Sequence, residues 1–412
     1  MRKITAVLLG IIAVLCFALH PVEAQRLVRT SLSGTMTPAS VNERMRSVFT
    51  EAAPPAATAD IDLIKITYTS TDQAGRPATL SGLVAMPRGG APRGLVVFNH
   101  GTIFDRRRSP SRWKGARDDS EAETATLAFA SGGYAVAMPD YIGLGDHVGT
   151  HPYPLNVVNA RSAVDIIGAA RSLAARQNYQ LGNRLFVTGY SEGGGVAMAL
   201  TKELESMPGS AYRVTAAAPA SGSYDLTGAT LDFLLRPTGA PEGFVIRLYL
   251  LSYSAFSFHK NNGAKLTDYF KPAMSFSIAQ NYKRTLTDED LIKRLAVTSA
   301  LMRANNSLRN VLTDRFVRVM EAKDTSDPVI RELAANNVYD WAPRTPMLLI
   351  NLEGDTIVDP ANTDNALRAM RARGVPAANL QHRVIRNPQL NHITAVPTAL
   401  AHARAYFDNQ PR

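Results

Sequence analysis

Ser191 lies in a G-x-S-x-G pattern with Gly189 and Gly193, directly after the apolar run Leu185–Tyr190. The run predicts a buried strand, and the residues from Val196 onward predict a helix. A serine at such a strand-to-helix turn holds its hydroxyl out from the top of a sheet, where it can act as a nucleophile. The glycines suit the turn because a Cβ at either position would collide with neighbouring backbone. The pattern also fits a tight turn in which Ser191 only caps the helix.

A serine hydroxyl becomes a useful nucleophile when a histidine takes its proton and a carboxylate orients that histidine. Asp355 follows the apolar run 346–352, and His392 follows the next predicted strand, 380–385. Because parallel strands end at the same edge of a sheet, we expect both side chains to lie near Ser191. This arrangement would make Ser191, His392 and Asp355 catalytic.

Asp359 is an alternative acid. It lies farther from the strand end and precedes Pro360, as a helix-capping residue does, so we prefer Asp355. The other histidines beyond the first 24 residues have structural interpretations: His100, His147, His151, His259, His382 and His402. No group of His, Asp and Glu residues has the spacing of metal ligands, so we expect no metal and no cofactor.

Attack by a serine on a carbonyl creates an oxyanion, which needs two hydrogen-bond donors. The backbone N–H of Glu192 would open the helix beside Ser191. The second candidate is the N–H of Thr102, in the loop after the apolar run 94–99. The His100-Gly101-Thr102 segment also fits a plain turn. Asp140 and Tyr141, after another buried strand, are expected to shape the wall of the cleft.

The elements that must hold these residues alternate between strand and helix. Such alternation predicts βαβ units and an α/β fold with a mostly parallel sheet flanked by helices. An antiparallel pair, 61–69 and 80–86, is expected at the sheet edge. The remaining predicted strands are 94–99, 134–138, 185–190, 214–220, 346–352 and 380–385. The helices predicted between and after them are 121–131, 157–178, 196–207, 361–373 and 394–407.

The alternation stops between about residues 221 and 345, where helical patterns rich in Leu, Phe and Tyr take over. We interpret this region as a helical lid or cap inserted into one domain, 61–412; a separate helical domain is the alternative. Residues 25–60 are rich in Pro, Ala, Ser and Thr, and we expect an extended N-terminal leader there with one short helix near 41–49.

The first 24 residues have the organisation of a secretory signal peptide, with cleavage expected after Ala24. Arg2 and Lys3 precede the apolar run Ile4–Leu19. An uncleaved anchor is the alternative, although the run is short for a membrane span. Cys16 is the only cysteine of the chain, so the mature protein would lack disulfides and cysteine chemistry. We expect a secreted or periplasmic protein with no stable membrane span after cleavage.

Length and composition fit a globular protein with a substantial core, and its basic charge does not by itself indicate a nucleic-acid partner. The chain has 412 residues, of which 45% are hydrophobic, and a formal net charge of +10. Most Lys and Arg residues are scattered, apart from a group at 106–117, which we interpret as a solvated basic loop. An exported protein rarely meets nucleic acid, so we expect no such partner.

Several of these segments together resemble the α/β-hydrolase superfamily over roughly residues 61–409. Within it, the chain is similar to secreted bacterial lipase/esterase-like hydrolases related to the fungal secretory lipases. The segments that carry the resemblance are Phe98–Thr102, Pro139–Gly145, His151–Tyr153, Gly189–Gly194 and Gly354–Val358. The resemblance implies the α/β-hydrolase fold with a helical lid or cap. It also implies a Ser191–His392–Asp355 triad, whose order along the chain is that of the superfamily, and an oxyanion hole near Thr102 and Glu192.

Glu192 departs from the family pattern, because an uncharged residue often follows the nucleophile. Its carboxylate could disfavour acidic substrates. The sequence thus predicts a secreted serine hydrolase that acts on small-molecule or lipid carboxylic esters through an acyl-enzyme on Ser191. An exported serine peptidase or amidase with the same triad is the alternative, and a non-catalytic binding protein of this fold is a further one.

Overall fold

The computed structural model describes residues 26–50, 53–89, 93–207, 212–239 and 241–411. The predicted signal peptide, 1–24, lies outside these residues and stays a prediction. Within the described ranges, no helix combines the length and the apolar character needed to cross a lipid bilayer.

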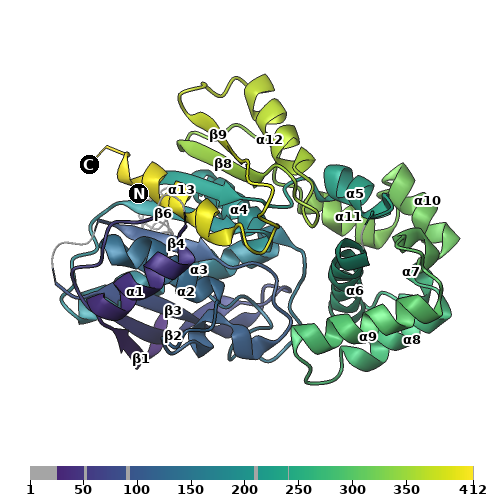
Figure 1. The fold of residues 1–412 in the computed structure, drawn as a ribbon, viewed down its shortest axis with the longest axis horizontal. Coiled ribbons are helices and arrows are strands. Elements are labelled where there is room, and N and C mark those ends of the chain that lie inside the picture. The colour runs from purple at the N-terminus through teal and green to yellow at the C-terminus, as the bar shows by residue number, and fades with distance from the viewer. Residues whose placement is uncertain (1–25, 51–52, 90–92, 208–211, 240, 412) are drawn as a thin grey trace, which may run out of the picture.

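The described residues form one nine-stranded sheet in the order β1-β2-β3-β5-β4-β6-β7-β8-β9 (Figure 1). Strands β1, β2, β3 and β5 pair antiparallel with one another, and all the pairings from β5 through β9 are parallel. The predicted mostly parallel sheet is therefore confirmed. The strands are β1 (Leu27–Met36), β2 (Ile61–Thr71), β3 (Pro77–Pro87), β4 (Leu95–Asn99), β5 (Ala135–Pro139), β6 (Leu185–Tyr190), β7 (Val214–Ala220), β8 (Met347–Leu352) and β9 (Leu380–Ile385).

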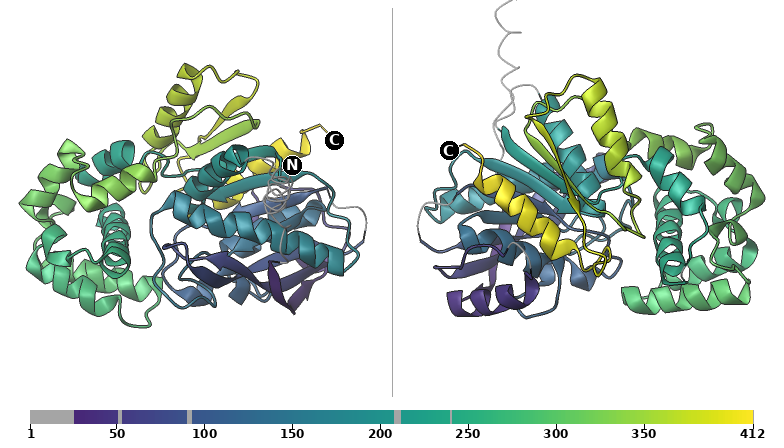
Figure 2. Two further views of the ribbon diagram at one scale, coloured as in Figure 1. Left: turned by 180° about the vertical axis from the view of Figure 1, so that it is seen from behind. Right: turned by 45° about the horizontal axis from the view of Figure 1, so that its top comes forward.

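Helices cover both faces of the sheet, as two views of the ribbon show (Figure 2). Successive strand residues point to opposite faces, so Leu185 and Val187 of β6 join one hydrophobic core while Phe186 and Tyr190 join the other. The first core includes α3 (Asn156–Arg176), α4 (Glu192–Ser206) and α12 (Ala361–Ala372). The second includes α1 (Pro38–Val48), α2 (Glu121–Phe129) and α13 (Val396–Asp408).

The segment between β7 and β8 is helical and lies beside the sheet, at the right of Figure 1. We call this segment the cap. Its helices are η4 (Leu226–Thr230), α5 (Leu231–Leu235), α6 (Pro241–Asn262), α7 (Leu266–Tyr269), α8 (Pro272–Asn281), α9 (Asp288–Leu301), η5 (Leu308–Asn310), α10 (Asp314–Ala322) and α11 (Pro328–Ala335). Cap residues such as Leu248 and Phe316 belong to the same hydrophobic core as Leu185 of the sheet. The hydrophobic core on this face of the sheet therefore continues into the cap.

Part of the segment expected as an extended leader, 25–60, is a strand of the sheet. Residues 27–36 form β1, which pairs with β2 and becomes the edge strand of the sheet. Residues 38–48 form α1, close to the predicted short helix, and its buried Val41 and Met45 join the second core. The antiparallel pair β2–β3 exists, but β1 covers its outer side.

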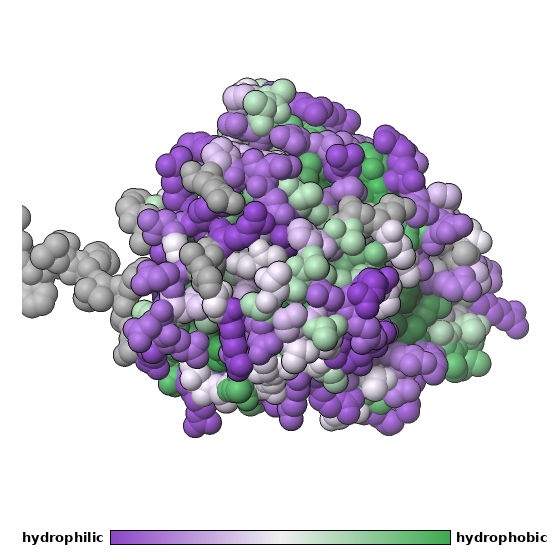
Figure 3. Space-filling model, turned by 60° about the vertical axis from the view of Figure 1, so that its left-hand side comes forward, coloured by the Kyte–Doolittle hydropathy of each residue, from purple (hydrophilic) through white to green (hydrophobic). Residues whose placement is uncertain are grey.

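The outer face shown in Figure 3 is largely hydrophilic, with apolar residues in small separate groups. The helices on this side thus turn their apolar residues inward, as helices that flank a sheet must do.

Candidate active site

Ser191 stands between the last residue of β6, Tyr190, and the first residue of α4, Glu192. Its backbone has φ 58° and ψ −122°, a conformation that residues with a Cβ rarely adopt. The Ser191 N–H donates to the carbonyl of Ala220 at the end of β7, at 3.1 Å. The turn is therefore held by the neighbouring strand, and its strain is that of a nucleophile elbow.

Glycines make this turn possible because there is no room for a side chain. A Cβ on Gly189 would collide with the carbonyl oxygen of Gly193, and a Cβ on Gly193 would collide with that of Asn99. Gly195 faces the side chain of Asn156 in the same way. Helix α4 consequently packs directly against the ends of β4 and β6, as the sequence pattern predicted.

The structure brings Ser191, His392 and Asp355 together from three separate segments. The Nε2 atom of His392 lies 2.8 Å from Ser191 Oγ, and its Nδ1 atom lies 2.6 Å from Asp355 Oδ2. His392 is 2% exposed and Asp355 is 6% exposed. Both follow strands that run parallel to β6, so all three residues lie at the same sheet edge.

Hydrogen bonds fix the tautomer of His392. Asp355 Oδ1 accepts the N–H groups of Ile357 and Val358, each at 2.9 Å, which leaves Oδ2 facing the imidazole. We assign the proton of the neutral ring to Nδ1 from this network, so Nε2 can accept the Ser191 hydroxyl proton. The carbonyl of His392 accepts the Tyr190 hydroxyl at 2.7 Å, which holds the loop in place.

Asp359 is placed elsewhere. Its carboxylate forms an ion pair with Arg236 of the cap and accepts the N–H of Ala361, at 3.0 Å, at the start of α12. It therefore acts as a helix-capping residue, and Asp355 is the carboxylate that contacts His392.

The two segments considered for the oxyanion, the start of α4 and the loop after β4, both lie next to Ser191. Glu192 is the first residue of α4, where backbone N–H groups have no acceptor within the helix. Thr102 follows Gly101, and a Cβ on Gly101 would lie 3.4 Å from the Cβ of Ser191. The loop after β4 thus lies against the serine, on the side where the sequence placed it.

No protein-family profile and no curated protein sequence matches the chain. Solved structures do match it along nearly its whole length. One is a Legionella pneumophila protein described as a "putative hydrolase", with 26% sequence identity and a TM-score of 0.75; the match covers 93% of this chain and 97% of that one.

Another is the rice cell wall degrading esterase LipA from Xanthomonas oryzae, with 24% identity and a TM-score of 0.77, covering 95% of this chain and 99% of that one. Candida antarctica lipase A matches at 14% identity with a TM-score of 0.63, covering 94% and 83%. The chain has the α/β-hydrolase fold. The similar structures agree with the lipase/esterase-like resemblance drawn from the motifs.

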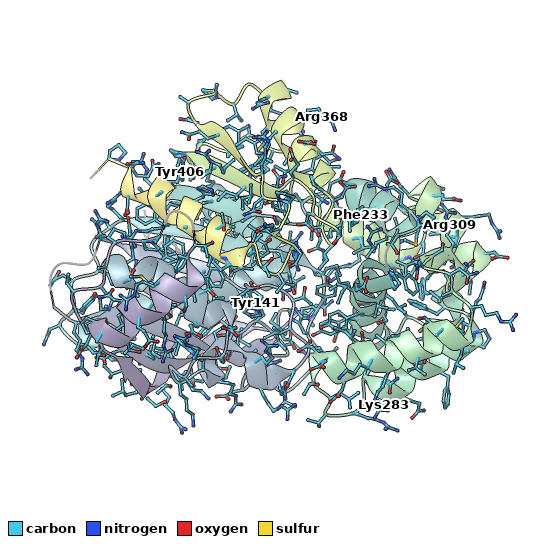
Figure 4. All side chains as sticks on the ribbon, viewed as in Figure 1. Tyr141, Phe233, Lys283, Arg309, Arg368 and Tyr406 are labelled. Atoms are coloured by element: carbon cyan, nitrogen blue, oxygen red, sulfur yellow. The ribbon has the colours of Figure 1, made fainter. Side chains whose placement is uncertain are left out.

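Within this fold, a largely apolar pocket extends from Ser191 into the cap. Phe233, one of its lining residues, lies in the cap (Figure 4). The polar lining residues include Ser191, Glu192 and Asn156. The apolar lining residues include Leu226, Leu231, Phe233, Leu234, Leu250, Leu251, Phe258, Phe270, Phe316, Met320, Val329 and Leu333. The pocket can therefore hold an apolar group beside the serine hydroxyl.

The sequence analysis missed a buried cation that joins the cap to the acid loop. The Arg247 guanidinium of α6 donates to the carbonyls of Phe233, at 2.9 Å, and Thr356, at 3.3 Å. Burial lowers its pKa to about 10, and Asp355 opposes this change electrostatically. The sequence offered one sign of this contact, a single arginine within an otherwise apolar helical pattern.

Glu121 and His151 were missed for a different reason. Glu121, at the start of α2, accepts the N–H of Gly101 at 2.8 Å, and His151 contacts Glu192. Both contacts join residues that lie at least 20 positions apart, so no local pattern reveals them. Among the residues that the structure describes, no group of three His, Cys, Asp or Glu side chains could hold a metal ion.

The position of Glu121 in the fold predicts a stability that depends on pH. Burial raises the pKa of its carboxyl to about 7, against the opposing effect of the Gly101 hydrogen bond. A carboxyl whose pKa rises on folding destabilises the fold as pH increases from its unfolded pKa through its folded pKa. Glu121→Gln, which keeps an acceptor for Gly101, should therefore raise the Tm by about 2 °C at pH 8 and by much less at pH 5.

Scanning calorimetry at both pH values measures this difference. The exposed Glu242→Gln variant is the matched control and should leave the Tm unchanged at either pH. A Tm gain of equal size at pH 5 and pH 8, or a loss at pH 8, would contradict the assignment.

Proposed function

We propose that this protein is an exported serine hydrolase that cleaves carboxylic esters. The observation that carries the proposal is the continuous chain of hydrogen bonds from Ser191 through His392 to Asp355. The strained turn at Ser191 adds support, since it exposes the hydroxyl above the sheet. The esterase and the lipase among the similar structures favour esters as the substrate class.

In the proposed reaction, Ser191 Oγ attacks the acyl carbon while its proton moves to His392 Nε2. The tetrahedral intermediate then expels the alcohol, which takes that proton from His392. Water repeats the sequence on the acyl-enzyme and releases the carboxylic acid. Asp355 keeps the proton on Nδ1 and stabilises the imidazolium that forms between these steps.

The oxyanion of each tetrahedral intermediate would accept hydrogen bonds from the N–H groups of Glu192 and Thr102. Glu192 offers the N-terminal amide of α4, where the helix dipole favours negative charge. Backbone donors at a fixed position cost no reorganisation when charge develops, which makes them effective in the transition state.

The cap supplies the proposed substrate preference. Because the pocket beside Ser191 is lined mainly by Leu, Phe, Val and Met side chains, it favours an apolar acyl group. Small-molecule and lipid esters are therefore the proposed substrates. Export rests on the signal-peptide pattern of residues 1–24.

Replacing Ser191 tests the proposed reaction directly. Ser191→Ala should lower kcat for p-nitrophenyl esters by about 10⁴-fold or more, because it removes the hydroxyl that is hydrogen-bonded to His392 Nε2. The assay uses p-nitrophenyl esters of rising acyl length together with one peptidyl anilide. Ser206→Ala, an exposed serine at the end of α4, is the matched control and should match the wild type.

Equal ester hydrolysis by the wild type and Ser191→Ala would contradict the proposed mechanism. Hydrolysis of the peptidyl anilide at a rate comparable to the esters would instead identify a peptidase or amidase with the same triad.

Narrowing the pocket tests the acyl site. Leu250 lies on α6 and lines the pocket, whereas Ile246, one turn earlier, does not. Leu250→Trp should lower kcat/KM for a dodecanoyl ester by about tenfold relative to an acetyl ester, since one obstructed apolar contact is worth about 1–3 kcal/mol. Ile246→Trp should leave the ratio of the two values unchanged. A loss of equal size for both esters in Leu250→Trp would contradict acyl binding in this pocket.

A further inference from the structure

Glu192, the residue after the serine, has a buried partner in His151. The Glu192 side chain is only 2% exposed, and its Oε1 atom lies 2.7 Å from His151 Nε2, whose side chain is 1% exposed. Asn159 Nδ2 lies 3.3 Å from the same oxygen. The two features of the sequence that the proposed reaction leaves unexplained, the charged residue of the elbow and the His-Pro-Tyr segment, are therefore in direct contact.

The hydrogen bonds of His151 determine how many protons the pair holds. Its Nδ1 atom lies 2.9 Å from the carbonyl oxygen of Ile142, which can only accept, so Nδ1 carries a hydrogen. The contact between Nε2 and Glu192 Oε1 then needs one more proton, on either the imidazole or the carboxyl group. The pair is an imidazolium with a carboxylate or a neutral imidazole with a carboxylic acid, and its net charge is zero in both cases.

Among the described residues, aromatic rings border the pair, and a second buried histidine, His100, lies within electrostatic range of Glu192. The His151 ring is stacked on Tyr141, labelled in Figure 4, with ring centroids 5.8 Å apart. Tyr253 of α6 lies 6.0 Å from the same ring. Within the described residues, the second oxygen of Glu192 has no hydrogen-bond partner. In a buried site of low dielectric constant, an unpaired charge acts more strongly and over a longer range than it does in water.

The cap holds His151 in this position. Ser257 Oγ of α6 donates to the carbonyl of His151 at 2.8 Å and accepts the N–H of Tyr153 at 3.1 Å. The imidazole therefore reaches Glu192 from a loop fixed on the cap, while the backbone of Glu192 belongs to the nucleophile elbow.

We propose that His151 is a positioning residue that shares one proton with Glu192 and so keeps the residue beside the oxyanion amide electrically neutral. The inference rests on the proposed function, because an oxyanion forms only if Ser191 attacks a carbonyl. Without His151, a buried carboxylate would stand next to the developing negative charge and raise the barrier. The pair also removes the reason to expect that Glu192 disfavours acidic substrates.

The test distinguishes the effect of losing the shared proton from the effect of disturbed packing. His151→Phe keeps a ring between the tyrosines but removes the shared proton. At pH 9, kcat for p-nitrophenyl acetate should fall about 10- to 100-fold with KM within about threefold of wild type, because the oxyanion exists only in the transition state. The double variant H151F/E192Q, which lacks the carboxylate charge, should recover most of that loss. His259→Phe, a histidine of α6 bonded to the Ala264 carbonyl, is the matched control and should match the wild type.

A wild-type kcat in His151→Phe would overturn the inference. Equal losses of kcat in His151→Phe and in H151F/E192Q would also overturn it, because a packing defect alone would explain that result. Circular dichroism and the Tm establish that each variant is folded. If His151→Phe does not fold, His151→Gln and H151Q/E192Q provide the same comparison. Full activity in Ser191→Ala is a separate outcome, which contradicts the proposed function itself.

Discussion

At the turn from β6 into α4, backbone packs directly against backbone. Gly189, Gly193 and Gly194 face carbonyl groups of Gly193, Asn99 and Ala220 so closely that a Cβ on any of them would collide. This close packing forces the chain to reverse at Ser191 with a positive φ, and it brings the first amide of α4 against the end of the sheet. The strain at Ser191 is balanced by the surrounding sheet, because β6 is hydrogen-bonded on both sides by β4 and β7.

Around this turn, several buried or half-buried ionisable groups have defined neighbours. Asp355 is held by two backbone N–H groups, Glu121 by the N–H of Gly101, and Glu192 by His151. Arg247 uses backbone carbonyls instead, and it connects the cap to the Asp355 loop. Because buried charges without partners are costly, these contacts restrict how the cap and the loops can be arranged. The cap is thus joined to the active site through polar contacts as well as through its apolar pocket.

Much of this structure could be predicted from the sequence, because the parallel strands are short, continuous apolar runs that alternate with helical patterns. The glycine spacing located the turn, and the strand ends located Asp355 and His392. The strand 27–36 could not be predicted in this way. It lies at the sheet edge with most of its side chains exposed, so it carries no apolar pattern. Its Pro- and Ala-rich surroundings also favoured a leader.

The polar contacts escaped prediction for a physical reason. Glu121 and His151 act through partners that the fold brings close, and neither spacing nor composition marks such pairs. Glu192 is different, because a carboxyl group directly beside the nucleophile already suggests from the sequence that it needs a buried partner. The sequence could pose that question, but the answer depends on where the fold places the loop between β5 and α3, which contains His151.

The central claim is that Ser191 forms the covalent intermediate. The most direct measurement is to react the protein with a fluorophosphonate, digest it and locate the adduct by mass spectrometry. The account predicts one phosphonyl group, on Ser191, and loss of ester hydrolysis in proportion to labelling. An adduct on another residue that abolishes activity, or ester hydrolysis that continues when Ser191 is fully labelled, would contradict it.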